Sequence, residues 1–238
     1  QRPVPAPVHN LRPARDTCEG CHWPDVFHGK KLKTIRSLAD GATPEDPQIS
    51  AILLNIGGLN ERTAKYEGIH WHVSRQNTVE YLAADEKRKE IKRVRVKRPD
   101  GSTEEFVKDK VAEPPKDRAW RTMDCIDCHN RPTHIYQTAE QAVDGLILNR
   151  KVPAGLPELR EIGLLAVKKP WDSDAAAKAG IAKEVGDAYK ARFPELAAQR
   201  ADDIAKATAA LHGAWAGNVF PTMKVTWGTY PTQLGHQN

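Results

Sequence analysis

The four cysteines of this chain form two short motifs of the same pattern, each followed at once by a histidine. Both read C-x-x-C-H: the first comprises Cys18, Cys21 and His22, and the second Cys125, Cys128 and His129. This spacing is the attachment signature of c-type haem, because two thiols a short turn apart can add to the two vinyl groups on one edge of the porphyrin. The adjacent imidazole can then bind the iron as its proximal ligand. The sequence therefore predicts two covalently attached haems c.

Three other uses of paired cysteines compete with this interpretation. Two C-x-x-C pairs can build a Cys₄ zinc site, but that site leaves both histidines unexplained, and 107 positions separate Cys18 from Cys125. A thioredoxin-like redox pair is expected to follow a strand and open a helix of a βαβ unit, and neither motif does so in the sequence pattern. A disulfide within C-x-x-C closes too small a loop to add much stability. Haem c accounts for all six residues.

The remaining histidines are candidates for the distal side of each iron. Two irons need two distal ligands, and seven histidines and two methionines remain, so the surplus of imidazole predicts bis-histidine coordination. His28 follows His22 by six residues and His134 follows His129 by five. Because an extended chain spans about 3.3–3.6 Å per residue, wrapping one haem edge over that length would be strained. Each is therefore expected to serve a neighbouring haem, the alternative being a surface or propionate-contacting histidine.

Two more candidates lie close together in residues 68–74, which read GIHWHVS. Alternation predicts a strand in which His70 and His72 share one face, opposite Trp71, so that one imidazole is a distal ligand and the other its neighbour. Zinc binding is the alternative, although no third or fourth ligand is visible nearby. His236 lies near the end of the chain and could bind a haem attached further along. The candidate distal ligands are His28, His70, His72, His134 and His236.

The segments between and after the two motifs differ in periodicity. Between them, short alternating runs predict strands, and Pro99-Asp-Gly predicts a hairpin that joins Ile91–Lys97 to Thr103–Val107. After the second motif, Thr138 and Gln141 have capping-box spacing, and helices are predicted over residues 138–150, 175–192 and 194–215. We expect an α+β fold dominated by haem, in which two C-x-x-C-H haem loops flank a small antiparallel β-sheet and a C-terminal helical pair follows.

This pattern divides the chain into five expected segments. They are a Pro-rich arm with the first haem c loop (1–30), a small antiparallel β insertion (31–118), the second haem c loop (119–137), a helical region (138–217) and an irregular tail leading into further haem sites (218–238).

Charge and hydropathy narrow the classes of partner. The net charge is +5, and residues 85–98 hold eight cations against three anions. That segment is either a docking patch for an anionic partner or the solvated face of a strand pair. It has no interleaved aromatic residues, so nucleic-acid binding is not expected. The longest apolar run, residues 49–59, is interrupted by Asn55, Gly57 and Gly58, which excludes a membrane-spanning helix there.

Four longer stretches carry a family resemblance. PVHNLRPARDTCEGCHWPDVFHG, GIHWHV, MDCIDCHNRPTH and NVFPTMKVTWGTYPTQLGH together resemble the NapC/NirT-type membrane-tethered multihaem cytochromes c, over essentially the whole chain. That family has N-terminal transmembrane helices and further haem motifs on both sides of such a segment. Here no C-x-x-C-H precedes Cys18 or follows His129. We expect an internal segment of a longer chain, the alternative being a reduced relative.

The resemblance implies a role in electron transport, as in anaerobic respiration. It implies that closely packed haems relay electrons from the membrane quinol pool to periplasmic or extracellular redox partners, with neighbouring haems beyond the segment ends. The expected location is the periplasmic side of the bacterial inner membrane or outside the cell, not the cytoplasm. The resemblance favours an electron-transfer protein over a catalyst. Such a protein could form part of a quinol dehydrogenase. The alternative is a multihaem oxidoreductase with an open haem site that reduces a nitrogen or sulfur oxide.

Overall fold

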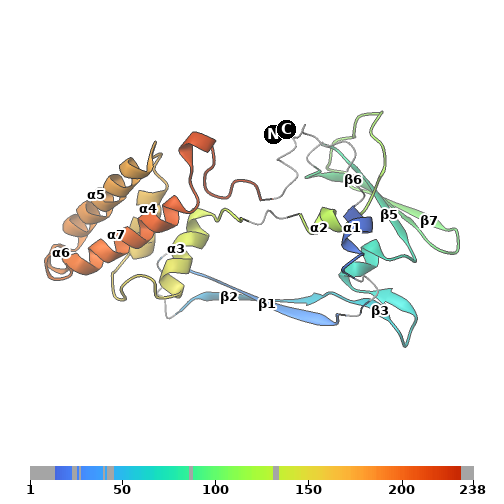
Figure 1. The fold of residues 1–238 in the computed structure, drawn as a ribbon, viewed down its shortest axis with the longest axis horizontal. Helices are drawn as coiled ribbons and strands as arrows, with labels where there is room; N and C mark the ends of the chain where they lie inside the picture. The colour runs from blue at the N-terminus through green and yellow to red at the C-terminus, as the bar shows by residue number, and fades with distance from the viewer. Residues whose placement is uncertain are drawn as a thin grey trace. The chain divides into compact units, whose positions relative to one another are not determined.

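The computed structural model describes residues 14–22, 26, 28–39, 41, 46–85, 88–130 and 134–231. The chain packs as two compact units (Figure 1). The first unit is formed by the described parts of Gln1–Lys33 and Ile52–Arg131, and the second by the described parts of Thr34–Ala51 and Pro132–Pro231. The five-segment division expected from the sequence stays a prediction.

The first unit is built mainly of strands and carries both C-x-x-C-H motifs. Its elements are α1 (Ala14–Cys18), the antiparallel pair β3 (Gly58–Asn60) and β4 (Lys65–Glu67), η1 (Ile69–Val73), the sheet strands β5 (Thr78–Ala83), β6 (Ile91–Lys97), β7 (Thr103–Val107) and β8 (Arg121–Thr122), and α2 (Cys125–Cys128). The sheet has the order β7-β6-β5-β8 and is antiparallel throughout. The predicted hairpin is confirmed, because β6 and β7 pair from Arg93 opposite Val107 to Lys97 opposite Thr103.

A separate two-stranded sheet contains β1 (Lys30–Ser37) and β2 (Gln48–Asn55). Most of its side chains are exposed, and they include Leu32, Ile49 and Leu53.

The predicted strand over residues 68–74 is wrong, because this segment is the 3₁₀ helix η1. Gly68 precedes it with φ +72°, a left-handed conformation that ends the extended run after β4. In a 3₁₀ helix with three residues per turn, residues two apart point in different directions. His70 and His72 therefore do not share a face.

Several cations of residues 85–98 pair with carboxylates of the same sheet. Arg95 and Lys97 both contact Glu80, at 2.6 and 3.0 Å, and Arg93 contacts Glu105 at 3.1 Å. Such cross-strand pairs on a partly exposed face contribute modestly to stability. They agree with the solvated face of a strand pair, and the docking-patch interpretation stays a prediction.

The second unit is helical. It contains α3 (Ala139–Leu148), α4 (Leu159–Val167), α5 (Asp174–Arg192), α6 (Pro194–Gln199), α7 (Ala201–Ala216) and η2 (Pro221–Met223). The capping box at Thr138 and Gln141 is confirmed, and Ser173 caps α5 by accepting a hydrogen bond from the Ala176 N–H. The described second unit therefore contains five helices instead of the expected helical pair. Helix α4 was not expected, because its N-cap residue, Glu158, has a left-handed conformation and makes no side-chain cap that the sequence could signal. The single helix expected over residues 194–215 is divided into α6 and α7 at Arg200.

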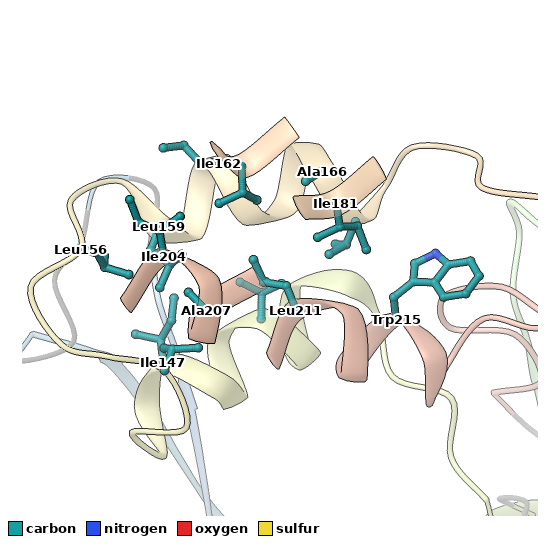
Figure 2. Packing of buried hydrophobic residues seen from close by; sticks show 14 of the residues in the cluster. Ile147, Leu156, Leu159, Ile162, Ala166, Ile181, Ile204, Ala207, Leu211 and Trp215 are labelled. Atoms are coloured by element: carbon teal, nitrogen blue, oxygen red, sulfur yellow. The ribbon is translucent and has the colours of Figure 1, made fainter. Parts of the chain in front are cut away.

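Aliphatic side chains from α3, α4, α5 and α7 meet in one core (Figure 2). Ile162, Ile181 and Leu211 are at most 2% exposed, and Trp215 closes one end. Burying a large aliphatic side chain contributes roughly 1.5–3 kcal/mol. Asp144 of α3 is also buried, and its carboxylate accepts hydrogen bonds from the Leu38 N–H and Arg160.

Two glycines of α5 give a matched test of this packing. A methyl group at Gly180 would lie 2.2 Å from the indole of Trp171, whereas Gly186 faces open space. Gly186→Ala should stabilise the chain by about 0.5–1 kcal/mol because it improves helix propensity. Gly180→Ala should destabilise it by about 1–3 kcal/mol, since Trp171 must move and lose its bond to the Ala166 carbonyl. Urea unfolding followed by tryptophan fluorescence measures both, and equal effects would contradict the Trp171 contact.

Within the described ranges, no helix has the length and apolar character needed to cross a membrane.

Candidate haem site

Each C-x-x-C-H motif is folded as one helical turn. The backbone N–H of His22 donates to the Cys18 carbonyl at 2.7 Å, and the backbone N–H of His129 donates to the Cys125 carbonyl at the same distance. These bonds join a residue to the one four positions earlier, as in an α-helix, so each histidine lies one turn from the first cysteine of its motif. The backbone of the two motifs therefore closes the same kind of turn between the first cysteine and the histidine.

The two motifs come together although the sequence separates them widely. Helix α1 ends at Cys18 and packs against α2, which begins at Cys125 (Figure 1). Cys18 is near enough to Cys125 to raise the pKa of that thiol electrostatically. The first unit thus gathers both predicted attachment sites in one place.

All four cysteines lie in the described part of the chain, and all four are free thiols. Partial burial is the main cause that raises the pKa of Cys125 to about 11, and Asp124 and Cys18 add to it. Burial and the charge of Asp127 likewise raise the pKa of Cys128. In the haem-free chain these two thiols are therefore protonated at neutral pH, because a raised pKa disfavours the thiolate.

This raised pKa predicts slow alkylation of Cys125. In the folded, haem-free chain, iodoacetamide should modify Cys125 at pH 8 about 10- to 100-fold more slowly than in the urea-unfolded chain, since only the thiolate reacts. The rate should rise with pH until about pH 11, where the folded thiol titrates. Mass spectrometry of the peptide containing Cys125 measures both rates. Equal rates, with circular dichroism showing that the fold is retained, would contradict the prediction.

His28 and His70 lie against each other in the first unit. Their ring centroids are 5.9 Å apart in an edge-to-face arrangement. The backbone N–H of His28 donates to the Gly57 carbonyl at 2.8 Å, and the backbone N–H of His70 donates to the neighbouring Ile56 carbonyl at 3.2 Å. The segment at residues 56–57 therefore fixes the backbone of both histidines.

The imidazole of His70 suits a metal ligand. Burial is the main cause that lowers its pKa, and nearby His28 and His129 lower it further. A lowered pKa keeps the ring neutral near pH 7, which leaves one ring nitrogen with a free lone pair. Nδ1 is buried and has no hydrogen-bond partner within the part of the chain that the structure describes. The effect of His129 also places His70 near the second motif.

His72 is exposed and its orientation is held by the backbone. Nδ1 lies 2.9 Å from the Ile69 carbonyl oxygen, which can only accept, so Nδ1 carries the proton. In the neutral ring Nε2 then carries the lone pair, the pattern common in metal-binding histidines. The ring also packs edge-to-face on Trp71, with centroids 5.6 Å apart.

Two other candidate ligands do not belong to the described part of the first unit. His134 belongs to the second unit, where its exposed ring lies 4.6 Å from that of Tyr136. His236 lies outside the described residues. His212, which the sequence does not single out as a ligand, lies 2.9 Å through Nε2 from the Asp174 carboxylate.

Several residues around the site could not be identified from the sequence. Asp127 lies inside the second motif and accepts hydrogen bonds from Tyr81 and Arg88. Gly57 and Gly68 both adopt positive φ and approach each other closely. The only sequence signal for these contacts is the Gly57-Gly58 pair, which interrupts an apolar run. Among the described residues, no group of three or more His, Cys, Asp or Glu is arranged to hold a metal ion.

Comparison with known proteins identifies a relative. The chain is 38% identical over 241 aligned positions to the cytochrome c-type protein ImcH of Geobacter sulfurreducens, a match that covers 98% of this chain and 46% of that protein. The chain therefore spans about half the length of this curated relative. No protein-family model and no solved structure matches it. The similarity to a c-type cytochrome thus extends over nearly the whole chain, whereas the NapC/NirT grouping stays a prediction.

Proposed function

We propose that this chain is an electron-transfer segment of a multihaem c-type cytochrome, with one haem c at each C-x-x-C-H motif. The observation that carries the proposal is that both motifs fold as the same helical turn and pack together in one unit. The similarity to a cytochrome c-type protein over 98% of the chain supports the same class.

The residues of the site fit haem c. All four thiols are free to form thioether bonds, and each motif places an imidazole one turn from its first thiol. The orphaned Nδ1 of His70 and the oriented ring of His72 suit distal ligands. Haem, when bound, supplies one-electron chemistry at iron, and the protein sets ligand type, burial and spacing.

Each residue has a proposed role. Cys18, Cys21, Cys125 and Cys128 attach the porphyrins, and His22 and His129 are the proximal ligands. His28, His70 and His72 are the distal candidates within the first unit. His134 and His236 are proposed for neighbouring haems, including haems attached beyond this segment.

The proposed path runs from the membrane quinol pool to periplasmic or extracellular acceptors. It rests on the resemblance of the motif-bearing stretches to NapC/NirT-type cytochromes, and on the assembly of c-type cytochromes outside the cytoplasm. The partners are redox proteins, the quinol pool and a membrane that the longer protein would reach through an anchor.

A reduced-minus-oxidised absorbance spectrum of the purified chain tests the proposal. We expect a sharp α-band after dithionite reduction and a haem-stained band that survives denaturing electrophoresis, because the haems are covalently held. A colourless chain that contains zinc and no iron would overturn it.

The second candidate is an oxidoreductase with one open iron site, which would reduce a nitrogen or sulfur oxide. The exposure of His28 and His72, which leaves their distal roles unfixed, is the observation that favours it. Titration with carbon monoxide and cyanide separates the two functions. Bis-histidine iron resists both ligands. An open site binds them, and the binding changes the absorbance spectrum.

A further inference from the structure

We infer that Asp127 is a positioning residue that holds the second haem motif on the β-sheet of the first unit and lowers the reduction potential of the haem attached there. The inference rests on the proposed function. Its basis is the juxtaposition of this carboxylate, which lies one position before Cys128, with three donors from outside the motif.

The carboxylate of Asp127 joins α2 to the sheet. Oδ1 accepts a hydrogen bond from the hydroxyl of Tyr81 at 2.7 Å and contacts the guanidinium groups of Arg88 at 3.2 Å and Arg121 at 3.4 Å. Tyr81 lies on β5 and Arg121 on β8, the strand that pairs with it. The side chain of Asp127 is 9% exposed, so the carboxylate itself is shielded from solvent, although Arg121 is partly exposed.

The other carboxylate oxygen fixes the start of α2. Oδ2 accepts from the Asp124 N–H at 2.8 Å, and the Asp124 side chain caps the same helix in return. Helix α2 has only four residues, so it has little stability of its own. The two oxygens of Asp127 therefore supply both its local cap and its attachment to β5 and β8.

The same geometry predicts an electrostatic effect. A carboxylate near a haem favours the ferric state, which carries one more positive charge, and so lowers the potential. With an asparagine, one oxygen becomes an NH₂ group and faces either the donors on the sheet or the Asp124 N–H, so one set of bonds is lost. Arg88 and Arg121 are then uncompensated, which raises the potential further.

A potentiometric titration of the haem-loaded chain tests this inference. With Asp127→Asn we expect one of the two redox components to move to a more positive potential while the other stays in place. The matched control is Glu104→Gln. It removes the negative charge of Glu104 from its exposed ion pair with Arg98 and should leave both redox components unchanged. Parental potentials in Asp127→Asn, or an equal shift in Glu104→Gln, would overturn the inference.

A milder variant keeps the test decisive if Asp127→Asn does not fold. Tyr81→Phe keeps the buried ring and the carboxylate charge but removes one donor. We expect the temperature at which the low-spin spectrum is lost to fall relative to Glu104→Gln, and an unchanged temperature would count against the positioning role. A parent chain without haem would refute the proposed function instead, so the two failures are distinguishable.

Discussion

A chain in which Cys18 and Cys21 are both replaced by serine should carry half of the haem of the parent chain. Serine keeps the size of the side chain but cannot form the thioether bonds that hold haem c. The reduced α-band per chain should fall to half, and the mass of the denatured chain should fall by one haem. The second motif keeps its own turn, closed by the bond from His129 to Cys125, so its haem should remain.

The reciprocal variant and a neighbouring substitution are the controls for this experiment. Replacement of Cys125 and Cys128 by serine should remove the other half of the haem, and replacement of all four cysteines should remove all of it. Thr17→Ser, next to Cys18 but outside the motif, should leave both haems in place. Full haem content in either paired variant would show that the thiols are not the attachment points.

The residues proposed to carry the chemistry could be singled out from the sequence because their signal is local. C-x-x-C-H fixes thiols and imidazole within five positions, and the structure gives each motif a helical turn. The hairpin of β6 and β7 was equally predictable, since the turn residues and the alternating strands lie within 17 positions, 91–107. Such signals need no knowledge of the rest of the chain.

What could not be predicted depends on contacts between distant segments. Nothing local indicates that α1 packs against α2, or that Asp127 meets Tyr81 across 46 positions. The alternation in residues 68–74 predicts a strand, but residues 69–73 form a 3₁₀ helix that begins directly after Gly68, where the chain approaches Gly57 closely. Tertiary packing therefore overrides the local period, and it also decides which histidines meet.

Gly57 is the position where a single methyl group should damage the site most. Its φ is +70°, and an alanine Cβ would lie 1.9 Å from the Glu67 carbonyl oxygen. The same glycine accepts from the His28 N–H and donates to the Gly29 carbonyl, so any shift of this backbone moves His28. His70 is bonded to the adjacent Ile56 and would move with it.

Gly57→Ala should therefore cost about 3–5 kcal/mol of unfolding free energy, because the left-handed conformation and the backbone overlap add together. Gly101→Ala is the matched control: its φ is +82° but nothing lies within 4 Å of the added methyl group, so only the conformational cost of about 1–2 kcal/mol applies. Chemical unfolding of the haem-loaded chains compares the two, and the low-spin spectrum reports whether the proposed distal imidazoles are displaced. Since both variants introduce the same residue at a positive φ, any excess loss in Gly57→Ala measures the close approach that brings His28 and His70 together. Equal losses in the two variants, with unchanged spectra, would show that this approach does not position the histidines.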